Sequence, residues 1–389
     1  MKKIRFFTSF FFLFFLLVSC TAFPYNTALP VTPTQQIESV EEITTPEAEE
    51  TIPTEDNTPK TLRIWLPPEF DPNAETDAAA ILRARLESFQ KRRPDLILEV
   101  RIKAVTGEAS LLNALIATYN AAPSIMPDLV ALQRPDLESA ANAGVLHPLE
   151  GLTDALDDPD WFPYAQPLAH IQNSAYGLPF ASNLLALRYE ASEDFPHPSI
   201  ESLSEEELQI LLSEDSAMLS FCFYDEENIE EESFTQLLSF YQSDLFTFTE
   251  TPNSLPIKWS KDFWDEGVDG VNLGAIPTPT GDVCSLASGW LWTLAGSDPE
   301  LQPDSVELAE YLSQSDFLAE WTQVTGYIAP RPTAILLAEE QALSLVAQVI
   351  PSNEIVEALA EKFNIAIMSV LTDQVDPSVA TQGLLESIQ

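Results

Sequence analysis

The chain has 389 residues, of which 45% are hydrophobic, and it carries a formal net charge of −43 at pH 7. This length suits two or three domains of about 150 residues each, and the hydrophobic content is sufficient for a sizeable core. The excess of carboxylates excludes charge-driven binding to nucleic acid or to anionic lipid headgroups, because both require a basic surface. It is typical of a solvated surface that keeps a protein soluble, and a dedicated cation-binding role has no support beyond the charge itself.

The first 20 residues have the pattern of an export signal. Residues 1–5 are basic, residues 6–18 are mostly Phe and Leu, and Cys20 follows a serine. The apolar run is shorter than the roughly 20 residues of a membrane-spanning helix, so it predicts a signal peptide rather than an anchor. Leu17-Val-Ser-Cys20 resembles a bacterial lipobox, in which the cysteine sulfur carries the lipid. We therefore expect residues 1–20 to be a lipoprotein signal peptide with Cys20 as the lipid attachment site. An ordinary signal peptide that contains a cysteine is the alternative.

Residues 21–60 have the composition of a linker. They are rich in Thr, Pro and Glu and contain few bulky apolar side chains. Such a segment cannot bury enough surface to offset the entropy lost on ordering, so we expect it to be disordered. It would tether a folded domain to the lipid anchor.

Residues 61–132 alternate between strand and helix patterns. Strands are expected at 61–66, 96–103 and 128–132, and helices at 77–93 and 111–119, the first of them capped by Asp77. This order predicts a parallel sheet with helices on its faces. Ligands bind at the carboxyl ends of the strands in such sheets, which places Trp65 and Gln133 near a site.

The stretch 176–189 predicts a crossing between two α/β lobes. Its Tyr-Gly-Leu-Pro start breaks the periodicity, and the nearly charge-free run that follows is typical of a strand buried on both faces. We expect a smaller second lobe beyond it, with helices over 203–213 and 234–241 and strands over 218–224 and 271–276. A helix over 306–325 would return to the first lobe, residues 326–332 would cross once more, and helices would complete the second lobe.

Sequence motifs for catalysis are absent. The chain contains no Gly-x-Ser-x-Gly, His-Glu-x-x-His or phosphate-binding loop, so we do not expect an enzyme or a cofactor. No Cys-x-x-Cys or paired-histidine spacing occurs, so no metal site is expected. We expect the acidic run 225–232 to be an exposed loop or a helix start. Cys222 and Cys284 could pair in an oxidising compartment or stay free.

Four stretches together resemble extracellular solute-binding protein family 1, the sugar-binding receptors of bacterial ABC importers. They are Ser-Ala-Ala-Asn-Ala-Gly-Val-Leu-His-Pro-Leu at 139–149, Tyr-Gly-Leu-Pro-Phe with its strand at 176–189, Gly-Trp-Leu-Trp at 289–292 and Gly-Tyr-Ile-Ala-Pro-Arg-Pro at 326–332. The order and spacing of these stretches carry the resemblance.

The resemblance implies a two-lobed α/β clamshell of the type II periplasmic-binding-protein fold, with a hinge of about three crossings. Its first lobe would comprise residues 61–178 and 285–326, and its second lobe residues 179–284 and 327–389.

The resemblance also implies a function. The protein would be a monomer, exported and lipid-anchored to the outer face of the cell membrane. It would capture a small polar solute, a carbohydrate in the first place, and deliver it to an ABC permease. Two alternatives remain open: a surface lipoprotein that uses the fold for sensing or adhesion without transport, and a secreted hydrolase.

Aromatic and polar side chains at strand ends and crossings are the candidate ligand contacts. Trp and Tyr stack on the apolar face of a sugar ring, while amides, carboxylates and Arg hydrogen-bond to its polar edge. The candidates are Trp65, Gln133, Tyr176, Asn183, Trp290, Trp292 and Arg331. Trp290 and Trp292 are expected on a loop that faces the cleft. Core burial is the alternative for each Trp, and a hinge-fixing salt bridge is the alternative for Arg331.

Overall fold

A computed structural model of the chain describes residues 59–191, 197–212, 214–225, 228–229, 231–267, 272–296 and 298–388. The expected signal peptide, Cys20 and nearly all of the expected linker lie outside these residues, as do parts of the acidic run. No helix among the described residues has the length and apolar content needed to span a membrane.

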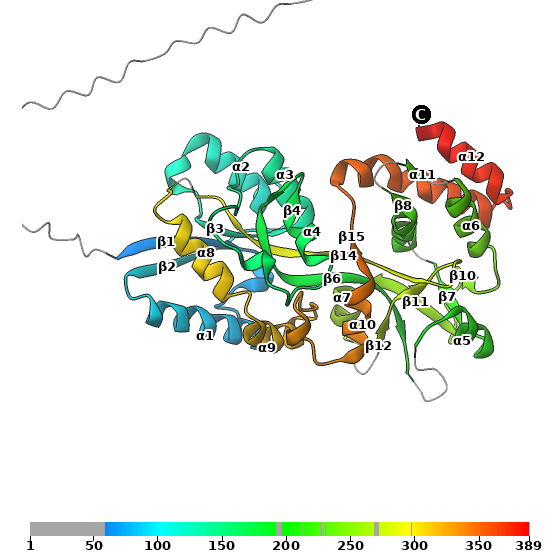
Figure 1. Cartoon of the computed structure of the whole chain (residues 1–389), viewed down its shortest axis with the longest axis horizontal. Helices are drawn as coiled ribbons and strands as arrows, with labels where there is room; N and C mark the ends of the chain where they lie inside the picture. Colours follow the sequence, from blue (N-terminus) through cyan, green and yellow to red (C-terminus); the bar gives the residue numbers. More distant parts are fainter. Residues whose placement is uncertain are drawn as a thin grey trace, which may run out of the picture. The chain divides into compact units, whose positions relative to one another are not determined.

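Eleven of the described strands form one sheet. These strands are β1 (Lys60–Leu66), β2 (Leu96–Ile102), β3 (Leu129–Gln133), β6 (Gly177–Tyr189), β7 (Gln209–Leu211), β10 (Phe246–Thr247), β11 (Ser254–Trp259), β12 (Asn272–Gly274), β13 (Ile276–Pro277), β14 (Val283–Leu294) and β15 (Ala347–Val349). Their main order is β10-β7-β11-β6-β14-β3-β1-β2, with β12 paired to β6 and with β13 and β15 paired to β14 (Figure 1). Two small hairpins are β4 (His170–Ile171) with β5 (Ser174–Ala175) and β8 (Tyr224–Asp225) with β9 (Asn228–Ile229).

The helices connect and cover these strands. They are α1 (Asp77–Arg92), α2 (Leu111–Ala121), α3 (Arg134–Asn142), α4 (Ala165–Ala169), α5 (Ile200–Glu205), α6 (Glu231–Tyr241), α7 (Ser260–Asp265), α8 (Gln302–Tyr311), α9 (Ser315–Thr325), α10 (Ala338–Val346), α11 (Asn353–Leu371) and α12 (Pro377–Ile388). Short 3-10 helices are η1 (Pro68–Phe70), η2 (Pro123–Ile125), η3 (Ala155–Asp157), η4 (Glu214–Phe223) and η5 (Pro332–Ala334).

The predicted β-α-β-α-β unit is confirmed. Strand β1 pairs in parallel with both β2 and β3, and α1 and α2 are the connecting helices. The cap of α1 differs from the prediction by one residue, because the Thr76 side chain accepts a hydrogen bond from the Ala79 amide at 3.1 Å and Asp77 is the first helical residue. Asp77 still carries a negative charge at the positive end of the helix dipole.

Three predicted elements of the later chain are wrong. The helix expected over 203–213 ends early, where Glu207 has a φ of +53°, and β7 follows because it finds partners in β10 and β11. The strand expected over 218–224 is mostly the 3-10 helix η4. The helix expected over 306–325 is interrupted between α8 and α9, where Arg85 binds the terminal carbonyl oxygen of Tyr311 at 2.8 Å. Each difference depends on a contact with a distant part of the chain.

Buried side chains form two hydrophobic cores. The first draws on residues 62–186 and 287–347, and the second on residues 185–286 and 359–384. In β6, Leu184 and Ala186 belong to the first core, whereas Leu185 and Leu187 belong to the second. Strand β14 likewise contributes Leu286 to the second core. The lobe boundaries given above remain a proposal, and these two strands are where the cores meet.

Strands β6 and β14 approach each other closely at Gly289. A Cβ atom at this position would lie 2.4 Å from the carbonyl oxygen of Ala181 in β6. The register of the pair shifts between Trp290 and Leu291, which pair with Ala181 and Pro179. Gly289 therefore stands in the middle of a continuous strand, and the expectation that Trp290 and Trp292 lie on a loop is wrong.

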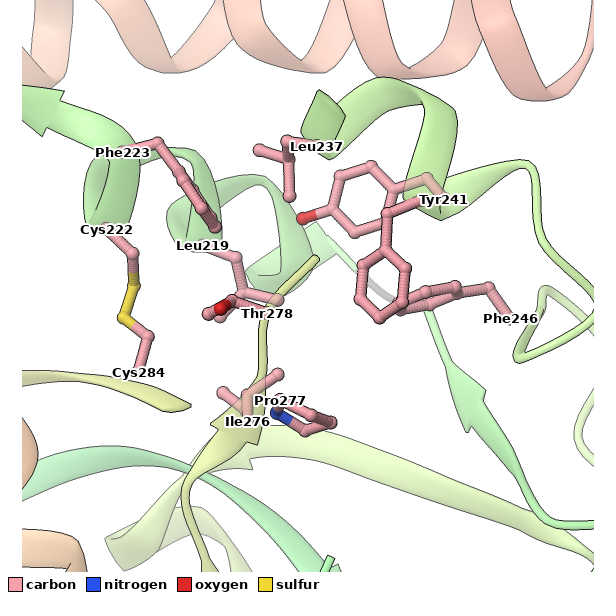
Figure 2. Close-up of a pocket in the computed structure, with 11 residues that line it drawn as sticks. Leu219, Cys222, Phe223, Leu237, Tyr241, Phe246, Ile276, Pro277, Thr278 and Cys284 are labelled. Carbon is pink, nitrogen blue, oxygen red and sulfur yellow. A yellow bond between two sulfur atoms is a disulfide. The ribbon is translucent and has the colours of Figure 1, made fainter. Parts of the chain in front are cut away.

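A disulfide between Cys222 and Cys284 joins η4 to the start of β14, which settles the pairing that the sequence left open. Figure 2 shows the disulfide at one side of a cavity that is also lined by apolar side chains, among them Leu219, Leu237 and Ile276. These side chains enclose a cavity of only about 10 Å³, which is room for about one water molecule. The region is thus a covalently braced part of the second core rather than a ligand site.

Removing the disulfide by the double substitution Cys222→Ala and Cys284→Ala should destabilise the fold. The bond joins residues separated by 62 positions, and the chain-entropy relation gives about 4 kcal/mol for a loop of that size at 25 °C. We expect a lower melting temperature by calorimetry, and a reductant should lower the melting temperature of the wild type but not of the variant. Equal melting temperatures for the two proteins would contradict a stabilising role.

The substitution Gly289→Ala should also destabilise the fold, because the new methyl group meets a main-chain oxygen that cannot rotate away. Overpacking of this kind costs about 1–3 kcal/mol, measurable by urea unfolding. The matched control is Gly383→Ala in α12, where nothing lies within 4 Å of the added atom and helix propensity predicts a gain of up to about 1 kcal/mol. Equal changes in the two variants would rule out the close approach as a constraint.

Candidate functional site

A cavity of about 840 Å³ lies among α7, β12, the end of α9 and the start of α10. Helix α7 follows β11 of the second core, whereas every lining residue that belongs to a hydrophobic core, such as Tyr327 and Ile335, lies in or against the first core. Its volume is in the range of about 300–1,000 Å³ that is typical of small-molecule sites. The lining mixes aromatic, aliphatic, amide and carboxylate side chains, among them Trp264, Tyr327, Asn272, Gln323, Glu339 and Glu340.

Trp264 is the aromatic side chain most available to a ligand in this cavity. It is 49% exposed, and its ring rests on Gly326, where a Cβ atom would come within 2.1 Å of the indole Cγ. Gly326 also ends α9 with a φ of +77°, a left-handed conformation that favours glycine. The same glycine therefore ends the helix and leaves room for the indole.

Asn183 fixes the start of α7, the helix that carries Trp264. The Asn183 Oδ1 atom accepts hydrogen bonds from the Ser260 hydroxyl and from the Lys261 amide, each at 3.0 Å. The Ser260 hydroxyl oxygen in turn accepts a bond from the Leu184 amide at 3.1 Å. Strand β6 thereby sets the position of one wall of the cavity.

A chain of hydrogen bonds runs from the buried sheet to the 3-10 helix η1, which follows β1. Trp290 Nε1 donates to the Tyr327 hydroxyl at 3.0 Å, and that hydroxyl donates to Glu69 Oε2 at 2.9 Å. The pKa of Glu69 is raised, because desolvation of its carboxyl group has a larger effect than the Tyr327 hydrogen bond and the Lys261 charge, which both lower it. Burial and the neighbouring Glu69 charge also raise the pKa of Tyr327, so its phenol stays protonated. The chain fixes the orientation of Tyr327 in the cavity wall.

Glu339 and Glu340 stand in the first turn of α10 and line the cavity. Both are half-buried. Burial, and secondarily the charge of Glu339, raises the pKa of Glu340. Glu339 also helps to raise the pKa of the buried Tyr189, after burial itself. This part of the wall is negatively charged.

Three of the predicted contact residues are enclosed tryptophans. Trp65, Trp290 and Trp292 are each no more than 2% exposed. The Trp290 ring meets Phe70 edge-on, Trp292 stacks on Phe180 at 4.2 Å, and Lys103 lies 4.4 Å from the Trp65 ring. In this structure the three indoles form part of the first core and present no face to a ligand.

The four remaining predicted residues have separate environments. Arg331 is buried, with its guanidinium 3.8 Å over the Trp161 ring and 3.1 Å from an Asp158 carboxylate oxygen, as the salt-bridge alternative anticipated. Gln133 is half-buried at the end of β3, and Tyr176 is half-buried against the first core. Asn183 supports α7 as described above.

None of the seven predicted residues lines the cavity, but two of them hold side chains that do. Asn183 holds Ser260, and Trp290 holds Tyr327. The prediction missed Trp264, although a tryptophan among charged residues in Lys-Asp-Phe-Trp-Asp-Glu was a signal that could have marked an exposed aromatic side chain. Among the described residues, no group of three or more His, Cys, Asp or Glu could hold a metal ion.

No protein-family model and no curated protein sequence matches this chain. Solved structures do match it. The sugar-binding protein MalE from Xanthomonas citri is 17% identical with a TM-score of 0.65, and the match covers 85% of this chain and 96% of that one. A cyclic alpha-maltosyl-1,6-maltose binding protein from Arthrobacter globiformis is 14% identical with a TM-score of 0.66, covering 85% and 98%.

A third match is the extracellular solute-binding protein family 1 from Alicyclobacillus acidocaldarius, at 13% identity and a TM-score of 0.60, covering 85% of this chain and 98% of that one. At identities this low, the structural matches establish the architecture of this chain and nothing further. The chain has the two-lobed α/β fold of the maltodextrin-binding proteins and of extracellular solute-binding protein family 1.

Proposed function

We propose that this protein is an extracytoplasmic solute-binding lipoprotein that captures a carbohydrate in the cavity beside Trp264 and delivers it to an ABC permease. The observation that carries the proposal is the cavity of about 840 Å³ with a half-exposed indole in its wall. One matching structure is described as a sugar-binding protein, another as a cyclo/maltodextrin-binding protein in complex with maltotetraose, and a third as a solute-binding protein with bound tagatose. An ABC transporter is named in the description of the tagatose-bound structure.

The cavity wall has the two kinds of group that a sugar requires. Trp264 offers a flat apolar face for the C–H side of a pyranose ring. Asn272, Gln323 and the two glutamates offer donors and acceptors for its hydroxyl groups. Trp264 stands on α7, which follows β11 of the second core, whereas Tyr327 belongs to the first core. A solute that contacts both would favour an arrangement in which both lobes close on it.

Two of the crossings expected to form the hinge, 176–189 and 326–332, are joined by main-chain hydrogen bonds. The Ser182 amide donates to the Ile328 carbonyl and the Ile328 amide donates to the Ser182 carbonyl, both at 2.8 Å. Residues around 328 are thereby tied to β6. We propose that rotation of the lobes occurs around these strands and closes the cavity on its solute.

Sensing or adhesion without transport remains the alternative function for the same site. A neighbouring permease gene would favour transport, and a neighbouring sensor kinase gene would favour sensing. A secreted hydrolase is disfavoured because the matching structures are described as binding proteins. Measured turnover of a glycoside or peptide substrate would be needed to support the hydrolase alternative.

The direct test is a thermal-shift screen with maltose, maltotetraose, other oligosaccharides, amino acids and polyamines. A ligand that binds only the folded state raises the melting temperature by mass action. We expect a carbohydrate to do so, with calorimetric titration to measure its affinity. Stabilisation by an amino acid alone would reject the carbohydrate and keep the binding function.

Trp264→Ala should weaken the affinity for the carbohydrate that the screen identifies. Loss of a stacked indole costs about 1–3 kcal/mol, which is about 5- to 150-fold in Kd. The melting temperature without ligand should change little, because the side chain is half-exposed. The contrasting variant is Trp290→Ala, which removes a side chain only 1% exposed and should cost about 3–5 kcal/mol of stability. Unchanged affinity in Trp264→Ala would remove this residue from the site.

Cys20→Ser should release the protein from the cell membrane. The lipid would be attached through the cysteine sulfur, and stable anchoring requires about two acyl chains, neither of which serine can receive through that linkage. Fractionation of cells that express each form should show the wild type with membranes and the variant in the soluble fraction. Retention of the serine variant in membranes would reject the lipobox interpretation.

A further inference from the structure

The charge of the proposed solute can be read from the cavity wall. Of the residues that line the cavity, the charged ones are Glu339 and Glu340, and no Lys or Arg is among them. Neither glutamate has an ion-pair partner within 4.0 Å among the described residues. A cavity with two half-buried, uncompensated carboxylates has a negative potential that favours a cation.

A chain with 61 acidic residues would have carboxylates near almost any cavity, so their presence alone decides nothing. What distinguishes these two is the absence of a counter-charge. Lys261 stands on the same helix as Trp264, but its ammonium group is paired with Asp265. Arg188 on β6 lies 3.9 Å from Glu266, and its guanidinium is 5.5 Å from the ring of Phe263 in the cavity wall. Neither cation forms an ion pair within 4.0 Å with Glu339 or Glu340.

The start of α10 offers only partial compensation. A helix N-terminus carries about half of a positive charge, and two carboxylates in the first turn exceed it. The raised pKa of Glu340, caused first by burial and then by Glu339, agrees with an excess of negative charge. The half-exposed Trp264 indole adds a ring face that attracts cations as well as sugar rings.

We propose that the solute captured in this cavity is positively charged, specifically an amino sugar whose ammonium group binds Glu339 and Glu340 while its ring stacks on Trp264. The inference rests on the proposed function, because it names the class of carbohydrate for the same site. A neutral sugar could donate hydroxyl hydrogen bonds to the two carboxylates but would leave their charge uncompensated, whereas an ammonium group would donate hydrogen bonds and also supply the counter-charge.

The test compares matched probes on the purified full-length protein. The probes are a glucosamine tetrasaccharide, the same tetrasaccharide fully N-acetylated, and spermidine as a cation without a sugar ring. Calorimetric titrations run at low ionic strength, because salt screens charge pairs, and at a slightly acidic pH that keeps the sugar amines protonated. We expect the amine form to bind at least about tenfold tighter than the acetylated form, the ratio that one charge-assisted hydrogen bond supplies.

The double variant Glu339→Gln and Glu340→Gln should abolish this preference while its melting temperature shows that it is folded. The matched control is Glu354→Gln, which removes an exposed carboxylate from the first turn of α11, outside the cavity. That control should keep the preference, which separates the role of the two glutamates from a general effect of acidic residues at helix starts.

The possible outcomes are distinct. Equal or tighter binding of the acetylated form, or a preference that survives in the double variant, would overturn the inference and leave the proposed function standing. Binding of spermidine but of neither tetrasaccharide would overturn the amino-sugar inference together with the carbohydrate function, and would identify a cation without a sugar ring as the solute. Binding of none of the three probes would overturn the inference.

Discussion

The antiparallel pairing of β6 and β14 is the constraint on which the rest of this structure depends. These two long strands contribute to both hydrophobic cores, and every other strand of the main sheet lies to one side or the other of the pair. Their separation is set at Gly289, where only a hydrogen atom fits against the Ala181 carbonyl oxygen. A larger residue would displace Trp290 and, through its hydrogen bond, Tyr327 in the cavity wall. The geometry of the site therefore depends on a main-chain contact inside the sheet.

Three arginines of this acidic chain join segments that are distant in sequence. Arg93 binds Asp304 at the start of α8, Arg85 binds Asp316 and the end of α8, and Arg331 ties the 326–332 crossing to Asp158. Hydrogen-bonded Arg–carboxylate pairs fix the relative positions of the segments that they join. Exposed ion pairs, in contrast, contribute little to stability. With 18 Lys and Arg against 61 Asp and Glu, this use leaves most carboxylates without a cation. The two glutamates of the cavity belong to that majority, which is why a ligand could supply their counter-charge.

Two residues that the sequence predicted as ligand contacts, Asn183 and Trp290, do not line the cavity but position residues that do. Asn183 positions the first turn of α7 and thereby the helix that carries Trp264. Trp290 orients Tyr327, whose hydroxyl continues to Glu69. A side chain placed by buried hydrogen bonds loses less conformational entropy when a ligand binds, so such support raises affinity without direct contact. Trp290 near the crossing thus supports the cavity wall, whereas the exposed indole of Trp264 comes from α7.

Local pattern alone determined the first part of the fold and the crossing. Alternation over 61–66 and 96–103, helical periodicity from Asp77 and the apolar run at 176–189 predicted parallel strands, their helices and a strand buried on both faces, because each depends on neighbours in sequence. Only the tertiary structure decided that residues 289–292 lie within a strand, since the pairing partners of β14 are β3 and β6, far away in the chain. The same holds for η4, which is joined to β14 by the disulfide, and for the break between α8 and α9, where Arg85 binds the helix end. The cavity could not be predicted for the same reason: α7, Gly326 and α10 are brought together by contacts that no local pattern records.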